Sequence, residues 1–341
     1  MKVLSDQQRS DWIQWIVRNK LHNTNDQDLI ERMRDRGFGE AQAVELVDSV
    51  SSSAVFRAAR SIAWRMQNLQ ALADVHLSLQ ALDPEAQTVD RIEGLSSVDF
   101  FLRYYVKNRP VIMTDLLNDW PALSKWSCDY LRDKYGRVKV RAQTRRKSFP
   151  IYEVFLKGHT EEMYFADFVD AVESTTGNNE IYLTANDGLL ELPEMNSMYE
   201  DCRPFPSFLT SELSPQKQFV WFGPQGALSP VHRDKLNVLM TQVMGRKRVK
   251  LISSHALHRM YNFESFFSEV DIERPDLERY PLFAGLRILD VVLQPGDALF
   301  IPVGWWHHVR SLDTSINVSF TNFAFPNEYR QFFPVDNTTA L

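Results

Sequence analysis

Ser229-Pro230-Val231-His232-Arg233-Asp234 is the stretch on which the interpretation of this chain depends. It carries an imidazole and a carboxylate two residues apart. Residues i and i+2 of an extended strand point to the same face, so both side chains can reach one metal ion from one direction. A second stretch later in the chain, Ile301-Pro302-Val303-Gly304-Trp305-Trp306-His307-His308, supplies a further imidazole. Together the two stretches predict a metal site made of two histidines and one carboxylate.

The bulk properties describe a large, acidic protein. The chain has 341 residues, of which 44% are hydrophobic, a net charge of −6 and a pI of about 5.8. This length suits one large domain and one smaller domain. The negative charge provides no global attraction to nucleic acid or to an anionic membrane, so we expect neither DNA nor a membrane as a partner.

Cysteine usage and the N-terminus favour a reducing compartment. Cys128 and Cys202 form no disulfide framework and no C-x-x-C motif. Residues 1–9 are polar and lack the apolar run of a signal peptide. No stretch approaches the roughly 18 apolar residues of a membrane span. We therefore expect a soluble, cytoplasmic protein.

The sequence pattern changes twice along the chain, which predicts a helical domain, a linker and a larger domain. Residues 1–80 repeat apolar side chains at helical spacing, and residues 81–95 are polar and aperiodic, as in a linker. Residues 96–335 mix helical and strand patterns and then become mainly short strands joined by turns. One of these turns, Gln294-Pro295-Gly296-Asp297, precedes an apolar strand, as in double-stranded β-helix barrels of the cupin type. The predicted fold class is mainly β with α, with a sandwich or barrel as its largest part.

Each half of the predicted metal site also has an ordinary structural explanation. A single His-x-Asp pair is common, and a histidine after two tryptophans is often a packed barrel residue. Found in this order in a chain with a β-barrel pattern, the two halves become specific. Two histidines and one carboxylate that leave coordination positions open are the ligand set of non-haem Fe(II) oxygenases. His307 and His308 cannot both be ligands, because adjacent residues of a strand face opposite ways.

These motifs resemble those of the JmjC-type Fe(II)- and 2-oxoglutarate-dependent oxygenases. The chain is most similar to the small JmjC-only protein hydroxylases, a group that includes asparaginyl and arginyl hydroxylases. The resemblance covers Ile92 to Phe325 and is carried by three runs: Trp221-Phe222-Gly223-Pro224-Gln225-Gly226-Ala227-Leu228-Ser229-Pro230-Val231-His232-Arg233-Asp234, Gln242-Val243-Met244-Gly245-Arg246-Lys247 and Phe300-Ile301-Pro302-Val303-Gly304-Trp305-Trp306-His307. It implies a double-stranded β-helix (cupin/JmjC jelly-roll) barrel with flanking helices. The helical N-terminal domain lies outside the resemblance.

The resemblance also implies which residues hold the metal. In the family, the distal ligand is the first histidine after the tryptophan pair, which here is His307. The implied ligands of Fe(II) are therefore His232, Asp234 and His307. We expect His308 to lie on the outer face of its strand.

The implied cosubstrate, 2-oxoglutarate, needs a cation for its far carboxylate. The family places a lysine after Gly-Arg, which here is Lys247, and an anionic cosubstrate explains why an ammonium would be buried. The alternative is a solvated lysine in the basic run Arg246-Lys247-Arg248-Val249-Lys250. By the same resemblance, Ser229, Tyr182 and Asn237 help to hold 2-oxoglutarate.

One family feature is missing. The aromatic side chain expected near the end of the last strand is replaced in a region that holds Ser319, Thr321 and Asn322. This departure leaves the implied cosubstrate contacts intact and puts the substrate in question.

The implied activity is that of a dioxygenase that uses Fe(II), 2-oxoglutarate and O2 to hydroxylate an amino-acid side chain in a protein or peptide. Within the same chemistry, the substrate could instead be a free amino acid, a metabolite or a tRNA base. An N-methyl-lysine demethylase is a further alternative, although the chain has no recognisable histone-reader module. From another class, the barrel could be a non-catalytic metal- or ligand-binding cupin.

The N-terminal helices carry more apolar surface than we expect short helices to hide among themselves. We therefore expect residues 1–80 to pack against the barrel or against a second copy of the chain, and a homodimer is the resulting hypothesis. The side chains concerned are Trp12, Trp15, Ile16, Leu29, Met33 and Trp64.

Overall fold

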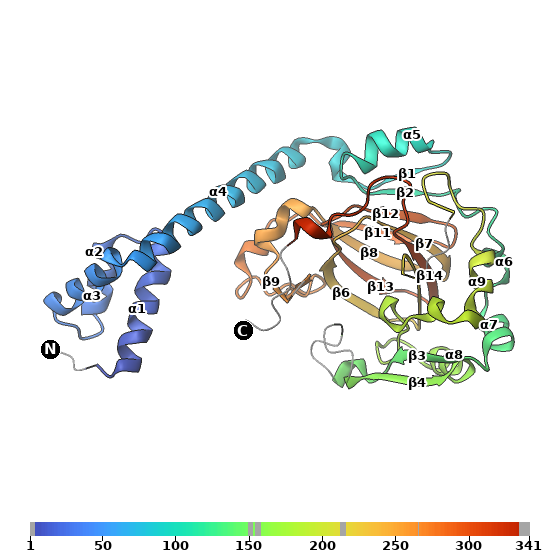
Figure 1. Cartoon of the computed structure of the whole chain (residues 1–341), viewed down its shortest axis with the longest axis horizontal. Coiled ribbons are helices and arrows are strands. Elements are labelled where there is room, and N and C mark those ends of the chain that lie inside the picture. Colours follow the sequence, from blue (N-terminus) through green and yellow to red (C-terminus); the bar gives the residue numbers. More distant parts are fainter. Residues whose placement is uncertain (1–3, 149–152, 154–157, 212–215, 265, 334–341) are drawn as a thin grey trace. The chain divides into compact units, whose positions relative to one another are not determined.

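The computed structural model describes residues 4–148, 153, 158–211, 216–264 and 266–333. The chain forms two compact units, Met1–His76 and Leu77–Leu341. The boundary lies close to the expected end of the helical domain at residue 80. Helix α4 (Ala54–Leu82) runs through this boundary without interruption (Figure 1).

The first unit is a small helical bundle. Its remaining helices are α1 (Asp6–Leu21), α2 (Asp26–Arg34) and α3 (Glu40–Ser52). The α1 helix begins with a capping box, in which the Ser5 side chain accepts from the backbone N–H of Gln8 and the Gln8 side chain accepts from the N–H of Ser5. Such caps satisfy backbone groups that the first turn of a helix leaves unpaired.

The bundle hides more apolar surface than the sequence led us to expect. Ile16, Leu29 and Met33 are fully buried within the helices of this unit, so the expectation that they need an external cover is wrong. Trp12 and Trp15 are partly buried in the same cluster. Trp64 on α4 differs from them, because 64% of it is exposed.

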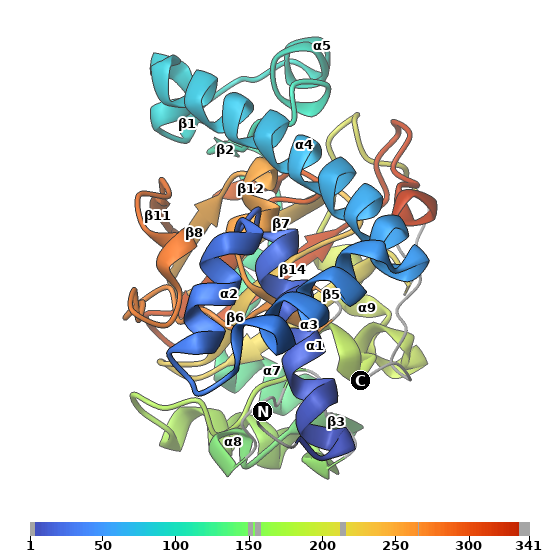
Figure 2. The same ribbon diagram turned by 90° about the vertical axis from the view of Figure 1, so that its left-hand side faces the viewer.

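The second unit contains two six-stranded sheets and one hairpin (Figures 1 and 2). The first sheet has, in spatial order, β1 (Asp90–Ile92), β2 (Val111–Met113), β12 (Ala298–Ile301), β7 (Val238–Met244), β14 (Ser315–Phe320) and β5 (Gln218–Gly223). The second has β11 (Leu289–Leu293), β8 (Lys247–Ile252), β13 (Trp306–Ser311), β6 (Leu228–Arg233), β10 (Phe267–Ser268) and β9 (Asn262–Glu264). The hairpin pairs β3 (Lys139–Gln143) with β4 (Thr160–Tyr164).

Short helices flank these sheets. The longest, α8 (Phe165–Ser174), buries four apolar side chains at helical spacing, including Phe168, whose ring meets that of Phe222 on β5 edge-on at 5.3 Å. The others are α5 (Ser97–Phe100), α6 (Pro121–Lys125), α7 (Cys128–Tyr135) and α9 (Ser197–Asp201). The expected mainly-β barrel with flanking helices and a helical N-terminal region is confirmed.

Residues 81–95, expected to be a linker, instead belong to the second unit. They contain a 3-10 helix, Pro84–Gln87, and the strand β1, which pairs in parallel with β2. Arg91 of β1 forms an ion pair with Asp297 at 2.7 Å, and the Asp297 side chain is 5% exposed. The polar composition of this segment therefore reflects an edge strand with ion pairs rather than a free connection.

None of the described helices is both long enough and apolar enough to cross a membrane.

Candidate active site

Two neighbouring strands bring the predicted metal ligands together. His232 on β6 pairs in register with His307 on β13, and their ring centroids are 4.1 Å apart. Asp234 follows directly after β6, and its Oδ2 lies 3.6 Å from Nε2 of His307. One ligand atom from each of the three side chains lies within 4.8 Å of the others. The spacing argument and the structure thus converge on the same three residues.

Backbone carbonyls orient both imidazoles. Nδ1 of His232 is 2.8 Å from the carbonyl of Pro230, and Nδ1 of His307 is 3.1 Å from the carbonyl of Trp305. A carbonyl can only accept, so each Nδ1 carries the proton and each Nε2 keeps a free lone pair for a metal. Burial, with a smaller contribution from His232, lowers the pKa of His307 to about 4, which keeps this imidazole in its neutral, metal-binding form. These donors fit Fe(II).

His308 lies on the other side of β13 and takes no part in this cluster. It is buried beside the ion pair between Glu273 and Arg310. Burial lowers the pKa of His308 to about 4 as well, so a low pKa alone does not distinguish a ligand from its neighbour. Strand alternation does distinguish them, as expected.

A hydrogen bond joins the two ligand-bearing segments. The backbone N–H of Gly304 donates to the carbonyl of Asp234 at 3.0 Å. Gly304 has φ +80°, a conformation that a side chain would disfavour, so glycine allows the tight turn before His307. The indole N–H of Trp305 donates to the side-chain oxygen of Asn108 at 2.7 Å and anchors this turn to the rest of the barrel.

Lys247, at the start of β8, is the second predicted key residue, and it is fully buried. Its ammonium donates to the hydroxyl of Tyr182 at 2.9 Å and to the side-chain oxygen of Asn317. Both contacts are neutral, and among the residues that the structure describes no carboxylate pairs with it. Burial alone lowers the pKa of Lys247 to about 7. Such a group calls for an anionic ligand.

The flanking cations behave as strand alternation predicts. Arg246 pairs with Asp313 at 2.8 Å and Arg248 pairs with Asp290 at 2.6 Å. Both arginine side chains are about half exposed, at 48% and 49%. Lys247 is therefore set apart from the basic run to which it belongs.

Close packing of the backbone holds Tyr182 beside Lys247. Tyr182 exchanges two backbone hydrogen bonds with Gln143, each 3.0 Å long. Its ring lies so near Gly223 that a Cβ at Gly223 would meet Cδ2 of the ring at 2.5 Å. A glycine at the end of β5 is thus required for the tyrosine to occupy this position.

The other two expected cosubstrate residues have different outcomes. Ser229 on β6 is buried and lines the cavity. Asn237 is not among the described residues that line the cavity. Its side-chain oxygen accepts a hydrogen bond from the backbone N–H of Val303 at 2.7 Å. Asn327 accepts from the N–H of Asn237 at 2.8 Å, which completes a brace behind the site. The structure therefore places Asn237 as a support of the turn before His307, away from the expected contact.

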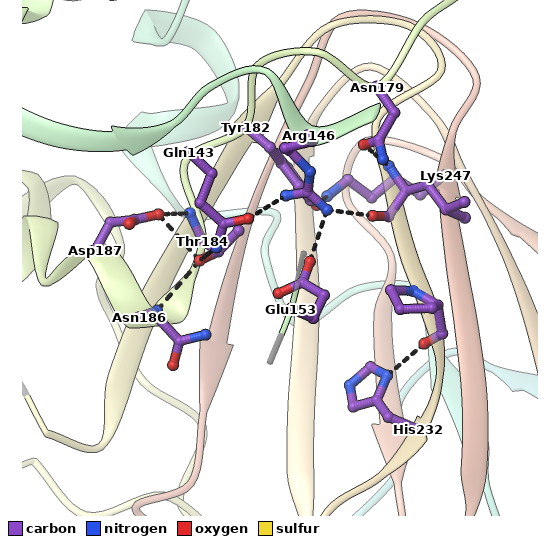
Figure 3. Close-up of polar contacts among 12 residues, drawn as sticks. Gln143, Arg146, Glu153, Asn179, Tyr182, Thr184, Asn186, Asp187, His232 and Lys247 are labelled. Atoms are coloured by element: carbon purple, nitrogen blue, oxygen red, sulfur yellow. Dashed lines mark hydrogen bonds and ion pairs between the residues drawn. The ribbon is translucent and has the colours of Figure 1, made fainter. Parts of the chain in front are cut away.

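The sequence did not reveal Asn317 and Arg146. Asn317 bonds to Lys247 and also donates to the hydroxyl of Ser319 at 3.3 Å. Arg146 is fully buried: it donates to the side chain of Gln143 at 2.7 Å and pairs with Glu153 at 2.6 Å (Figure 3). Its guanidinium also bonds to the carbonyl of Leu228 on β6 at 2.7 Å and lies 5.0 Å from the centre of the Tyr182 ring. The only signal in the sequence was a basic run, Arg145-Arg146-Lys147, typical of solvated charges.

A cavity of about 580 Å3 between the sheets connects these groups. Lys247 and the three candidate metal ligands all line it. Other wall residues are aromatic, as at Phe219 and Trp221 on β5. Two more carry hydroxyl groups: Ser319 on the neighbouring strand β14, and Thr321 directly after that strand. The positions that lack the family's aromatic side chain thus contribute hydroxyl groups to the wall.

Comparison with known proteins agrees with this arrangement. A "Lysine-specific demethylase 8" of Xenopus tropicalis is 30% identical over 250 residues, which are 72% of this chain and 54% of the relative. The "Lysine-specific demethylase JMJ30" of Arabidopsis thaliana is 30% identical over 264 residues, or 75% of this chain and 59% of the relative. The human "tRNA wybutosine-synthesizing protein 5" is 27% identical over 257 residues, or 70% of this chain and 79% of the relative.

The chain spans little more than half the length of the two demethylases, 54% and 59%. A family model described as a cupin-like domain matches residues 97–327, which are well over half of the chain. A relative of Drosophila melanogaster, 27% identical, is named "Jumonji C domain-containing protein 5". This protein therefore belongs to the cupin-like, JmjC-type domain family.

Proposed function

We propose that this protein is an Fe(II)- and 2-oxoglutarate-dependent oxygenase that hydroxylates an amino-acid side chain in a protein or peptide. The observation that carries the proposal is Lys247, a buried ammonium with which no carboxylate pairs among the described residues, in the same cavity as a two-histidine, one-carboxylate cluster. A ligand that satisfies both features is a metal chelator with a second, distant carboxylate, and 2-oxoglutarate is such a ligand.

The described residues divide the work of holding these groups. His232, Asp234 and His307 would hold Fe(II), and Lys247, supported by Tyr182 and Asn317, would hold the far carboxylate. When bound, iron and 2-oxoglutarate supply the chemistry that inserts one atom of O2 into a C–H bond, while the other atom leaves with succinate and CO2 is released.

The chain itself contributes preorganisation. The carbonyls behind His232 and His307 fix both imidazoles before a metal arrives, so little reorganisation is needed on binding. The phenol of Tyr182 and the amide of Asn317 hold the ammonium in place. The aromatic side chains Phe219 and Trp221 give the cavity an apolar wall that limits the access of water.

Two observations support a protein or peptide substrate. The cavity extends from Lys247 past the metal ligands to Lys235 and Arg330, so it offers room beyond a small dicarboxylate. Two of the relatives are named lysine-specific demethylases, a name that refers to an amino-acid side chain. The tRNA-modifying relative makes a nucleic-acid base the alternative to be tested.

The first experiment measures succinate formation by the purified full chain with Fe(II), 2-oxoglutarate and O2. Slow turnover without added substrate, lost on removal of the metal, supports the oxygenase. If the metal-loaded protein neither binds 2-oxoglutarate nor converts it, the protein is a non-catalytic cupin and the proposal is wrong.

The second experiment identifies the substrate class. The full chain is incubated with cell extract, and peptides and tRNA nucleosides are compared by mass spectrometry with and without 2-oxoglutarate. A peptide that gains the mass of one oxygen atom supports side-chain hydroxylation. Loss of a methyl group from lysine, or oxidation confined to a nucleoside, would replace that substrate class by another.

A further inference from the structure

Asn108 follows the helical segment Phe101–Tyr105 and lies outside the strands that carry the candidate metal ligands. Its φ is +50°, a left-handed conformation that most side chains avoid and that asparagine tolerates. Residues held in such conformations cluster at functional sites, where the surrounding contacts outweigh the strain. The side chain of Asn108 has such contacts with residues that follow 195 and 197 positions later in the chain.

These residues form the turn before His307. The side-chain amide of Asn108 donates to the carbonyl of Val303 at 3.0 Å. The indole N–H of Trp305 donates to the side-chain oxygen of Asn108 at 2.7 Å and to its backbone carbonyl at 2.9 Å. Asn108 therefore holds two residues of the turn, and it uses both ends of its side-chain amide to do so.

A second asparagine, Asn237, holds the same turn through the other polar group of the Val303 backbone. The N–H of Val303 donates to the side-chain oxygen of Asn237 at 2.7 Å, while its carbonyl accepts from Asn108. Asn237 is itself fixed, because Asn327 accepts from its N–H at 2.8 Å and donates to its carbonyl at 3.1 Å. With its N–H and its carbonyl both paired, the backbone of Val303 has one well-defined position.

The turn reaches the metal site through Trp305. This side chain is 5% exposed and belongs to the same apolar cluster as Ile301 and Val309. The backbone carbonyl of Trp305 lies 3.1 Å from Nδ1 of His307 and orients that imidazole. Asn108 thus holds the indole of the residue whose carbonyl sets the direction of His307. Groups that orient a metal ligand contribute roughly ten- to a hundredfold to metal affinity.

We propose that Asn108 is a positioning residue of the candidate metal site, which fixes the imidazole of His307 through Trp305. The proposal rests on the proposed function, because it takes His307 as a ligand of Fe(II). The role of Asn108 is to set the geometry of the site before a metal binds. A residue that only stabilised the barrel would change the free energy of unfolding and leave metal binding as it is.

The first test measures the Kd of Mn(II) for the full chain by electron paramagnetic resonance. Asn108→Gly tolerates the positive φ and removes the side-chain amide, and Trp305→Phe removes the indole N–H but keeps an aromatic ring. Each variant should raise the Kd of Mn(II) about tenfold. The spectrum of bound Mn(II) should also broaden, because an imidazole that is no longer fixed gives the ion several environments.

Trp120→Phe is the matched control. The indole of Trp120 is 3% exposed and donates to the carbonyl of Pro204 at 2.8 Å, so this variant loses a similar hydrogen bond within the same unit. Neither residue is among the described residues that line the cavity. Trp120→Phe should lower the stability in urea as Trp305→Phe does and keep the wild-type Kd and spectrum of Mn(II). An equal loss of Mn(II) affinity in the control would overturn the proposal.

The double variant Asn108→Gly with Trp305→Phe tests whether the two residues act together. Both single changes break the same hydrogen bond, so their effects should not add. The double variant should bind Mn(II) nearly as well as either single variant, with a Kd far below the roughly hundredfold increase that two independent tenfold effects would give. Fully additive losses would show that Asn108 does not act through Trp305 and would overturn the proposal.

The results separate this proposal from the proposed function. If the wild type binds Mn(II) and converts 2-oxoglutarate while Asn108→Gly and Trp305→Phe bind Mn(II) equally well, only the positioning role is wrong. If the wild type does not bind Mn(II), the metal site itself is wrong, and both proposals with it. Should Asn108→Gly fail to fold, Trp305→Phe and its control decide the same question.

Discussion

Replacing Lys247 by methionine separates the cost of burying an ammonium from the benefit of binding an anion. Burial lowers the pKa of Lys247 from 10.5 to about 7. Each pKa unit corresponds to about 1.4 kcal/mol, so the folded protein without a ligand holds the charged form at a considerable cost. Replacing buried charges by apolar groups of similar volume stabilises proteins by about 1–4 kcal/mol in known cases. We expect Lys247→Met to raise the free energy of unfolding by an amount in this range.

The affinity for 2-oxoglutarate should change in the opposite direction. A charge-assisted hydrogen bond contributes about 1.5–3 kcal/mol, and each 1.4 kcal/mol is about tenfold in Kd. Loss of the ammonium should therefore raise the Kd of 2-oxoglutarate roughly ten- to a hundredfold. Metal affinity should remain, because none of the three candidate metal ligands contacts Lys247 through a hydrogen bond in the described structure.

Two measurements on the same samples check this pair of effects. Unfolding in urea, followed by tryptophan fluorescence, gives the stability, and calorimetric titration of the Mn(II)-loaded protein gives the Kd of 2-oxoglutarate. Lys250→Met is the matched control, because Lys250 lies on the same strand and its ammonium contacts the carbonyl of Ile272 at 3.5 Å. A Lys247→Met protein that is less stable and binds 2-oxoglutarate normally would refute the reasoning.

Three further predictions concern the same cavity. His307→Ala should lose Mn(II) binding while His308→Ala keeps it, as measured by electron paramagnetic resonance; the reverse result would exchange their roles. Asn317→Asp should give Lys247 an internal carboxylate and weaken 2-oxoglutarate about ten- to a hundredfold, whereas Asn317→Ala has a smaller effect; equal affinities for wild type and Asn317→Asp in calorimetric titration would place Asn317 outside the cosubstrate site. Because only the ammonium form of Lys247 attracts the carboxylate, and its pKa without ligand is about 7, the Kd should rise as the pH increases above 7, with uptake of a proton on binding. Titration in buffers of different ionisation enthalpy measures this uptake, and a Kd independent of pH between 6 and 9 would contradict it.

Periodicity predicted part of the centre of the site, and the family resemblance supplied His307. His232 and Asp234 are two residues apart, and strand geometry alone places them on one side. The same alternation separated Lys247 from Arg246 and Arg248, as the structure shows. These predictions depend only on residues close together in the sequence: Lys247 and its neighbours on β8, and His232 on β6 with Asp234 directly after that strand.

Contacts between distant segments could not be predicted in this way. Lys247 and Asn317 are 70 residues apart and lie on strands of different sheets, so no local pattern relates them. Asn237 follows Asp234 in the loop before β7, where strand alternation no longer applies, and the structure turns its side chain toward Val303. Arg146 resembled a surface charge because its partners lie outside the basic run: Glu153 follows seven residues later, and the carbonyl of Leu228 belongs to β6.

The sequence predicts segment boundaries poorly where a strand is short and polar. The three-residue strand β1 begins with Asp90 and is too short to show a period, so its sequence does not differ from that of a linker. In the first unit, the burial of Ile16 and Met33 depends on how three helices pack together, which spacing along each helix does not determine.

The hydrogen bond from the backbone N–H of Gly304 to the carbonyl of Asp234 links the two turns that carry the candidate metal ligands. We expect a metal ion held by Asp234 and His307 to restrain both turns, and with them the amide of Gly304 that donates to the carbonyl of Asp234. The exchange of that amide hydrogen with deuterated solvent thus becomes a gauge of metal occupancy. This measurement requires no substrate.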